Sequence, residues 1–550
     1  MANQFSARHI GITERDLPKM LETVGVKSVD ELIDQTIPAN IRLPKPMNLP
    51  TAMTEQEFLN HVHELAKKNV IADNFIGLGY YGTITPAVIL RNVFENPVWY
   101  TSYTPYQAEI SQGRLEALLN FQTMISDLTG LKLANCSLLD EATSAAEAMT
   151  MMYALRSRDQ QKAGINKLFV DEKIFRQTKD VLATRSMPQG IELVYGDFDK
   201  FDFSTPVFGA ILQYPNAEGT IADYRAFVEK AHAAGAKVAV AADIMSLVLL
   251  TPPGEFGADI AFGSTQRFGM PLYFGGPSAA YFASHEENKR FMPGRLVGIS
   301  KDVNGKPALR LALQSREQHI KREKALSNIC TAQALPAIMS GFYAAYHGND
   351  GLRKIAGDIH KKAVIIAAAL TEMGCKQLNE TYFDTLRIEL PAGKCAKDIR
   401  KAAEARLVNL CYYENGTIGI STDETTTCES VAKLLSAFAE VLGVATPALK
   451  CSCCCEGVAL PKELVRTSKA LNHEIFEKYH TETEMMRYIK TLDRKDISLA
   501  HSMISLGSCT MKLNAAAELL PLSWPEFTGI HPFAPESQCQ GYKELIKNLE

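Results

Sequence analysis

A carboxylate and a polar turn in the middle of the chain are of types and spacing that could do chemistry. Asp243 directly follows an apolar run, and the turn Gly263-Ser264-Thr265-Gln266-Arg267 follows the next one. A glycine-rich segment, Gly275-Gly276-Pro277, comes after the turn. Parallel α/β sheets hold ligands beyond the carboxyl ends of their strands. From position alone, Asp243 is either a site residue or a structural residue at the edge of the sheet.

The order of aspartate, turn and glycine-rich segment resembles that of fold-type I pyridoxal-phosphate enzymes. In those enzymes the aspartate pairs with the pyridinium nitrogen, and a lysine in the turn forms the Schiff base. Here no lysine occurs between Lys237 and Lys289, and Gln266 or Arg267 stands in its place. An amide cannot form an imine, and a guanidinium is too weak a nucleophile at neutral pH. We therefore interpret Asp243 and Gln266 as a vestigial site in a sheet that holds no cofactor in this half.

The elements around these residues alternate between strands and helices. Val207 to Gln213 and Lys237 to Ala242 are apolar runs typical of strands buried on both faces, and Ala222 to Ala234 between them has helical periodicity. A strand–helix–strand unit predicts a parallel sheet. Leu386 to Leu390 alternates like a half-buried strand. The predicted fold is α/β and fold-type I transferase-like, with a mostly parallel sheet flanked by helices and a smaller α+β domain.

Changes of composition and pattern divide the 550 residues into five parts. The predicted parts are a helical arm (1–70), a large α/β domain without the Schiff-base lysine (71–340), a small α+β domain (341–445), a linker with a cysteine cluster (446–472), and the truncated start of a second, catalytic repeat (473–550).

An internal repeat supports this division. Ile504-Ser505-Leu506-Gly507 lies 428 positions after Ile76-Gly77-Leu78-Gly79, and Gln540-Gly541 lies the same distance after Gln112-Gly113. Chance is the alternative explanation, but the ungapped spacing of both pairs argues against it. We expect residues 500–550 to be loosely held, because the sheet on which a second copy should pack is missing.

Composition and charge exclude several classes of protein. Apolar residues make up 46% and charged residues 22%, as in ordinary globular proteins. A formal net charge of −4 gives no electrostatic reason to expect a nucleic acid or an anionic membrane as partner. No apolar run is long enough to span a bilayer, and Met1 to Arg15 does not resemble a secretory signal. We expect a cytoplasmic protein with reduced thiols.

Several long strings resemble the P-protein family of the glycine cleavage system. They are Phe5-Ser6-Ala7-Arg8-His9-Ile10-Gly11, Tyr103-Thr104-Pro105-Tyr106-Gln107, Glu109-Ile110-Ser111-Gln112-Gly113-Arg114, Ser315-Arg316-Glu317-Gln318-His319-Ile320, and Leu506-Gly507-Ser508-Cys509-Thr510-Met511-Lys512-Leu513-Asn514. Ala108, Tyr273 and Ser278 depart from the family's usual residues, which affects the shape of loops rather than membership.

The resemblance implies an enzyme, glycine dehydrogenase (aminomethyl-transferring, decarboxylating). The family decarboxylates glycine on pyridoxal 5'-phosphate and passes the aminomethyl group to the lipoyl arm of the H-protein. The implied partners are the H-protein, the C-terminal half of the same protein, a second copy in a homodimer, and the T-protein and L-protein of the same system. The family's Schiff-base lysine would lie beyond Glu550, so we expect this chain to be inactive alone.

The resemblance also suggests residues near the site. The candidates for cofactor contact in the second copy are Ser508, Cys509, Thr510 and His531. Ordinary turn chemistry for the first three, and a structural histidine for the last, are the alternatives. A cluster of tyrosines could line the channel of the lipoyl arm, brace the interface between the halves, or pack in the core; it comprises Tyr80, Tyr81, Tyr103 and Tyr106.

Two other functions remain as alternatives. The first is a non-catalytic scaffold subunit, although the segment 460–550 speaks against it, because a separate first subunit would not carry the start of a second half. The second is a thiol or metal-binding module built on Cys451 to Cys455. A structural zinc site usually takes two separated pairs of ligands, and this cluster has no partner group. We therefore predict no metal site.

Overall fold

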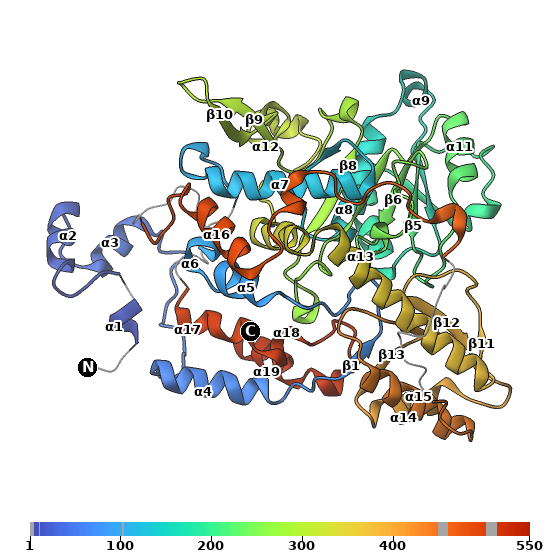
Figure 1. Ribbon diagram of the computed structural model, residues 1–550. Coiled ribbons are helices and arrows are strands. Elements are labelled where there is room, and N and C mark those ends of the chain that lie inside the picture. Colours follow the sequence, from blue (N-terminus) through green and yellow to red (C-terminus); the bar gives the residue numbers. More distant parts are fainter. Residues whose placement is uncertain (1–4, 10, 102–103, 449–459, 502–513) are drawn as a thin grey trace. The chain divides into compact units, whose positions relative to one another are not determined.

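A computed structural model describes residues 5–9, 11–101, 104–448, 460–501 and 514–550 (Figure 1). Tyr103, the turn Ser508–Thr510 with Cys509, and the cluster Cys451–Cys455 lie outside the described residues. The chain forms two compact units. The larger comprises Ile71–Leu513 and Thr528–Gln538, and the smaller comprises Met1–Val70, Asn514–Phe527 and Cys539–Glu550.

A seven-stranded sheet forms the centre of the larger unit. Its strands, in order across the sheet, are β2 (Leu133–Ala134), β8 (Ala280–Ser284), β7 (Ile260–Ser264), β6 (Lys237–Ala242), β5 (Gly209–Tyr214), β3 (Lys167–Asp171) and β4 (Glu192–Gly196). The strands from β7 to β4 are parallel, whereas β8 pairs antiparallel with both of its neighbours. The prediction of a mostly parallel sheet is therefore confirmed.

The strands predicted around Asp243 form where the apolar runs lie. Strand β6 has the predicted bounds, and every residue of β5 is buried. Helix α11 (Arg225–Ala233) connects them, and Gly235 follows it with a φ of 76°, a left-handed conformation that favours glycine. Helix α8 (Glu141–Ala154) packs on the sheet and shares an apolar core with β3, β6 and β7.

A five-stranded sheet belongs to the smaller α+β part of the same unit. Its order is β1 (Asp73–Phe75), β13 (Val408–Tyr412), β14 (Ile418–Ser421), β12 (Thr385–Glu389) and β11 (Lys376–Gln377). Helices α14 (Ala396–Glu404) and α15 (Cys428–Leu442) pack with it around a common core. The long helix α13 (Ala334–Glu372) bends at Gly348, where φ is 60° and ψ is −170°.

The remaining elements of the larger unit surround these sheets (Figure 1). They are α5 (Ala87–Ile89), α6 (Pro97–Tyr100), α7 (Gln112–Thr129), α9 (Arg158–Lys162), α10 (Arg176–Ser186), α12 (Gln318–Lys321), α16 (Glu482–Asp493), and the antiparallel hairpin of β9 (Val297–Lys301) and β10 (Pro307–Leu311).

The smaller unit brings the two ends of the chain together. Its helices are α1 (Ser6–His9), α2 (Leu17–Val24), α3 (Val29–Thr36), α4 (Glu55–Ala66), α17 (Ala516–Leu519), α18 (Pro525–Thr528, which crosses the unit boundary) and α19 (Gln540–Leu549). Phe527 of α18 is buried against Val62 and Ala66 of α4, and Tyr542 of α19 packs on the same cluster. Residues of α18 and α19 thus pack on α4, while the expectation that residues 500–550 are loosely held stays a prediction.

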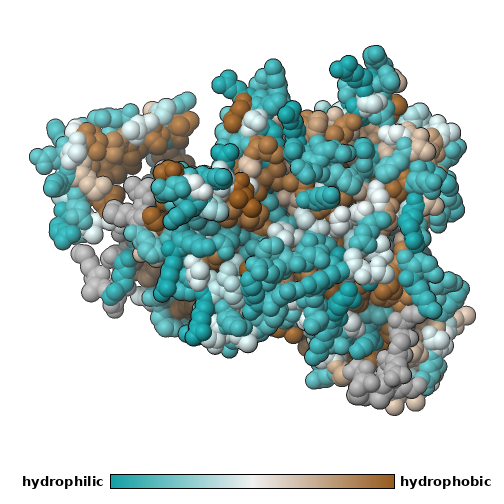
Figure 2. Space-filling view, turned by 45° about the horizontal axis from the view of Figure 1, so that its top comes forward, coloured by the Kyte–Doolittle hydropathy of each residue, from teal (hydrophilic) through white to brown (hydrophobic). Residues whose placement is uncertain are grey.

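Many apolar side chains of the N-terminal arm are exposed. They include Met20, Val24, Ile41, Leu43, Met47 and Leu49. Figure 2 shows brown, hydrophobic surface among the hydrophilic residues of the molecule.

Two helix contacts in the structure match at the offset of the predicted repeat. Helix α16 has the length of α4 and lies 427 positions after it, and α19 begins 428 positions after α7. In the larger unit α16 packs on α7, and in the smaller unit α4 packs on α19. In the predicted repeat, the N-terminal helix of each copy therefore packs on a helix of the other copy.

A glycine permits the close approach at both contacts. A Cβ atom on Gly113 of α7 would lie 2.0 Å from the carbonyl oxygen of Leu492, and one on Gly541 of α19 would lie 2.2 Å from that of Leu65. Equivalent ion pairs flank the two glycines, Lys495 with Glu116 and Lys68 with Glu544. The matched contacts support a true repeat rather than chance identity.

Candidate functional site

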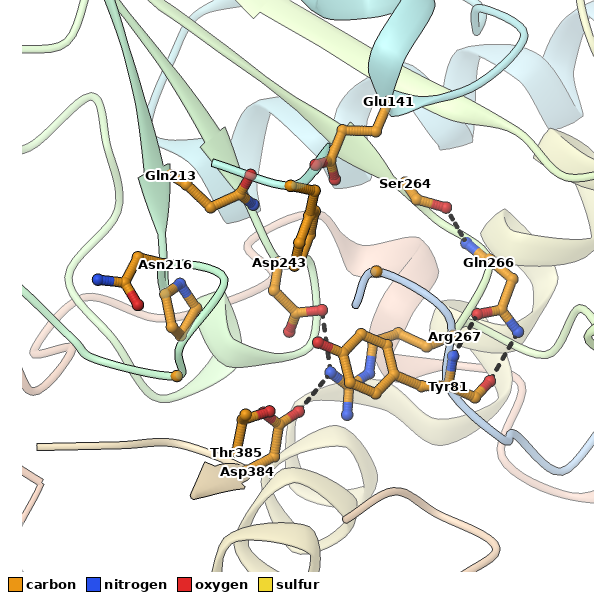
Figure 3. A pocket seen from close by; sticks show the side chains of 14 residues that line it. Tyr81, Glu141, Gln213, Asn216, Asp243, Ser264, Gln266, Arg267, Asp384 and Thr385 are labelled. Carbon is orange, nitrogen blue, oxygen red and sulfur yellow. Dashed lines mark hydrogen bonds and ion pairs between the residues drawn. The ribbon is translucent and has the colours of Figure 1, made fainter. Parts of the chain in front are cut away.

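A pocket lies at the carboxyl ends of β5, β6 and β7, where the sequence predicts the vestigial site (Figure 3). The lining side chains come from these strand ends, the start of α8, the loop that follows β1, and the start of β12 in the small sheet. Those used below are Tyr81, Glu141, Gln213, Asp243, Gln266, Arg267 and Asp384.

Arg267 occupies the centre of this pocket. Its Nη1 donates to Oδ2 of Asp243 at 2.9 Å and to Oδ2 of Asp384 at 2.7 Å, and its guanidinium carbon lies 3.9 Å from the centroid of the Tyr81 ring. The Arg267 side chain is only 3% exposed. Burial opposes its charge, but the carboxylates of Asp243 and Asp384 outweigh burial and raise the pKa of Arg267. The side chain that replaces the lysine therefore ties the aspartate into an internal ion pair.

In this arrangement the guanidinium group of Arg267 forms ion pairs with two carboxyl groups, those of Asp243 and Asp384. Burial raises the pKa of Asp384 to about 6, although Arg267 acts in the opposite direction. The charge of Asp243 adds to the effect of burial, because a second carboxylate nearby disfavours ionisation. Two carboxyl groups thus share one guanidinium group in this cluster.

The start of helix α8 is acidic where it meets the pocket. Asp140 caps the helix by accepting the N–H of Thr143 at 2.7 Å. Glu141 follows and is partly buried as a whole. Its Oε1 atom is shielded from solvent and has no hydrogen-bond partner among the described residues. Burial, helped by the charge of Asp243, raises the pKa of Glu141 to about 8. A helix N-terminus ordinarily favours an anion, but here protein carboxyls occupy it.

Pyridoxal phosphate does not fit this pocket. Arg267 fills the middle, and the side chains of Asp140 and Glu141 occupy the start of α8, where a phosphate would otherwise bind. No lysine lies between Lys237 and Lys289 to form an imine. The pocket therefore lies where a cofactor site is expected but lacks residues that could hold pyridoxal phosphate.

Gln266 faces away from the ion-pair cluster. Its Nε2 donates to the carbonyl oxygens of Tyr81 at 2.8 Å and Met270 at 2.6 Å, and its Oε1 accepts the N–H of Tyr81 at 3.0 Å. These bonds fix the backbone at Tyr81, whose ring then lies on Arg267. Of the two residues that the sequence left open at the lysine position, Arg267 is the one beside Asp243 (Figure 3).

His531 holds the turn that precedes Tyr81. Its Nε2 lies 3.1 Å from the carbonyl oxygen of Gly77 and 3.2 Å from that of Tyr80, and its Nδ1 accepts the N–H of Phe533. The ring is 1% exposed, and burial lowers the pKa of His531 to about 4. The histidine is therefore neutral at pH 7, with Nε2 donating to the turn.

The other tyrosines of the predicted cluster occupy different places. The ring of Tyr80 stands edge-on to that of His531 at 6.0 Å. Tyr106 lies elsewhere, with its hydroxyl 3.0 Å from that of Thr331 and its ring 5.1 Å from the guanidinium carbon of Arg295. The structure brings Tyr80, Tyr81 and His531 together and leaves Tyr106 apart from them.

Two residues of the cluster lack a clear signal in the sequence. Asp384 lies 117 positions after Arg267, and no local pattern connects them. Glu141 is preceded by Asp140 in a helix-start pattern, which signals a cap but not a pocket.

The described residues offer no other cofactor or membrane feature. They contain no group of three or more His, Cys, Asp or Glu side chains that could hold a metal ion. Within the same residues, no helix combines the length and apolar character needed to cross a bilayer.

Comparison with known proteins agrees with the architecture. The sequence profile of the family described as "Glycine cleavage system P-protein" matches residues 7–438. "Glycine dehydrogenase (decarboxylating)" of Bacteroides fragilis is 61% identical over 545 residues, which cover 99% of this chain and 57% of the relative. The same-named protein of Nostoc punctiforme is 55% identical over 558 residues and is covered to 56%.

A solved structure has the same fold. The crystal structure of glycine decarboxylase (P-protein) of the glycine cleavage system, in inhibitor-bound form, superposes with a TM-score of 0.71 at 32% identity and covers 78% of this chain and 99% of the other. The predicted fold class is thus confirmed. The chain spans little more than half the length of the curated relatives that it matches. From the profile, these identities and the shared fold, the chain belongs to the P-protein family of the glycine cleavage system.

Proposed function

We propose that the intact protein is a cytoplasmic, pyridoxal-phosphate-dependent glycine decarboxylase that passes the aminomethyl group to the lipoyl arm of the H-protein. Its membership of the P-protein family supports this activity. The proposal includes a homodimer that works with the T-protein and L-protein of the same system. The cofactor would supply an electron sink for the carbanion left by decarboxylation.

Within that enzyme, the copy described here has a supporting role. The observation that carries this assignment is the ion pair of Arg267 with Asp243 and Asp384. The Arg267 side chain fills the pocket where a cofactor would bind, and its guanidinium group cannot form an imine. The catalytic lysine then belongs to the second copy, and the chain of 550 residues is inactive alone. The contacts of α16 with α7 and of α4 with α19 support an arrangement in which the two copies exchange their N-terminal helices and are thereby held together.

The proposed site residues follow from the repeat. Ser508, Cys509 and Thr510 correspond to the turn after Gly79 and would border the cofactor in the second copy. His531 would act by holding the turn at Tyr80, as its hydrogen bonds suggest. Tyr80, Tyr81, Tyr103 and Tyr106 remain candidates for the channel of the lipoyl arm or for the interface between halves.

A non-catalytic scaffold subunit is the second candidate, and the closed pocket favours it for this copy considered alone. One experiment separates the two. The intact protein, loaded with pyridoxal phosphate and given lipoylated H-protein, should release labelled carbon dioxide from carboxyl-labelled glycine, whereas the 550-residue chain should not. Release by neither would refute the enzyme proposal, and release by the 550-residue chain would refute the supporting role.

A further inference from the structure

The turn Gly77–Gly79, which precedes Tyr80 and Tyr81, has a strained backbone. Its three residues have φ values of 69°, 55° and 92°, so Leu78 takes a left-handed conformation that residues other than glycine rarely adopt. Such strain costs about 1–3 kcal/mol and persists only where the surrounding structure fixes the backbone. The groups that fix this turn therefore indicate its role.

Two acidic residues just after β14 hold the segment that follows the turn. Oδ2 of Asp423 accepts the N–H of Gly82 at 2.6 Å. Oε2 of Glu424 accepts the hydroxyl of Thr83 and the N–H of Ile84, both at 2.8 Å. The small α+β part thus fixes three consecutive residues beyond the turn.

The two segments approach each other too closely for larger side chains. A Cβ atom on Gly82 would lie 2.3 Å from Oγ1 of Thr425 and 2.8 Å from Oδ2 of Asp423. One on Gly77 would lie 2.1 Å from Oγ of Ser421. Glycine is therefore required at both positions where the small sheet meets the turn and the segment after it.

Glu424 is itself held by helix α13. The hydroxyl of Tyr343 donates to Oε2 of Glu424 at 3.0 Å, and Nζ of Lys362 donates to the backbone carbonyl of Glu424 at 3.4 Å. Burial raises the pKa of Glu424, although the hydrogen bonds that its carboxyl accepts act in the opposite direction. An amide oxygen can accept the same bonds, so this place needs an acceptor rather than a negative charge.

The other side of the turn is held by a residue that the predicted repeat assigns to the second copy. Nε2 of His531 lies 3.1 Å from the carbonyl oxygen of Gly77 and 3.2 Å from that of Tyr80. The Tyr80 ring stands edge-on to the rings of His531 and Phe533, at 6.0 and 5.9 Å. All of these residues belong to the larger unit. The turn therefore connects the small α+β part with the opening of the second copy.

We propose that Asp423 and Glu424 are positioning residues for the reaction. Through the turn they hold Tyr80 in a fixed place against His531 and Phe533 of the second copy, without touching the reacting atoms themselves. This inference rests on the proposed function, in which the second copy carries the catalytic lysine. A misplacement of about 1 Å can cost about a hundredfold in rate, even when its cause lies far from the chemistry.

Two substitutions of Glu424 in the intact, cofactor-loaded protein test the proposal. Glu424→Ala removes the acceptor, so kcat for release of carbon dioxide from glycine should fall by about thirtyfold, with KM for glycine within about threefold of the wild type. Glu424→Gln keeps an oxygen acceptor of the same shape and should keep most of the wild-type kcat. An acid or base function would be lost in both variants. The matched control is Glu429→Ala in α15, where the side chain is 79% exposed, and it should change kcat by less than about twofold.

A double-mutant cycle separates positioning from a mere loss of stability. Because Glu424 and His531 hold the same turn, the losses of kcat in Glu424→Ala and His531→Ala should not multiply. The double variant should lose no more than about threefold beyond the larger single loss. Losses that multiply, a normal kcat in folded Glu424→Ala, or a Glu424→Gln variant as slow as Glu424→Ala would overturn the proposal.

Milder variants keep the proposal testable if Glu424→Ala does not fold. Thr83→Val and Tyr343→Phe each remove one donor to Glu424 and should lower kcat by about threefold. A normal kcat in both would overturn the proposal as well. If the wild type releases no carbon dioxide from glycine at all, the proposed function fails instead, so the two failures are distinguishable.

Discussion

Replacement of Arg267 by methionine should destabilise the larger unit in a pH-dependent way. Methionine keeps much of the buried volume but removes the charge that Asp243 and Asp384 share. Removal of one partner from a buried ion pair costs about 3–5 kcal/mol, because the other charge is left without compensation. The side chains of Arg267 and Asp384 are 3% and 5% exposed, so solvent screens little of this cost.

The pH dependence follows from the carboxyl groups. Burial already raises the pKa of Asp384 to about 6, above its usual value near 3.9. A carboxyl whose pKa is raised in the folded state contributes stability below about pH 4 and loses it as pH rises through the folded value. Without Arg267 that pKa rises further. The variant should therefore be about 4 kcal/mol less stable at pH 8, and the difference should fall by half or more at pH 5.

Thermal melts of the 550-residue chain at both pH values check this expectation. A loss of about 4 kcal/mol corresponds to roughly 5 °C in melting temperature for a unit of this size. Arg225→Met is the control, because Arg225 forms a half-exposed pair with Asp223 and should change the melt by about 1 °C or less. The triple variant R267M/D243N/D384N should recover most of the loss at pH 8. A loss that is the same at pH 5 and pH 8 would refute the electrostatic reasoning.

Two further predictions concern buried groups. Glu141→Gln should stabilise the protein by on the order of 4 kcal/mol at pH 9 and by little at pH 5. Burial raises the pKa of Glu141 to about 8, so ionisation of this carboxyl destabilises the folded protein as pH rises from about 4 through that value. Thermal melts across this pH range check the expectation, and a difference between variant and wild type that does not change with pH would count against it. Gly113→Ala and Gly541→Ala should each destabilise their helix contact by about 2–4 kcal/mol, since the added Cβ would lie 2.0 and 2.2 Å from a backbone carbonyl oxygen; hydrogen exchange of α16 and α19 measures this. Gly357→Ala, in helix α13 with open space around it, should be neutral or slightly stabilising, and an equal loss there would contradict the steric explanation.

The fold could be predicted wherever one local pattern decides it. Strands such as β6 are buried on both faces, so their sequence is a continuous apolar run. The long helix α13 was less predictable. It begins at Ala334, and it passes through Gly348 with a bend that no local pattern in the sequence predicts.

The site could be predicted in part. The absence of a lysine after β7 is a fact of the sequence, and it predicts that this turn forms no Schiff base. Whether Gln266 or Arg267 faces Asp243 depends on the path of the backbone after the strand, which residue types do not reveal. The contribution of Asp384 depends on how the small sheet meets the large one, which is a tertiary contact without a local signature.

Covalent trapping tests the central claim most directly. The 550-residue chain, mixed with one equivalent of pyridoxal phosphate, reduced with borohydride and mapped by mass spectrometry, should show no lysine modified in stoichiometric yield, because Arg267 fills the pocket and cannot form an imine. A stoichiometric adduct on a lysine within residues 71–445 would contradict the account.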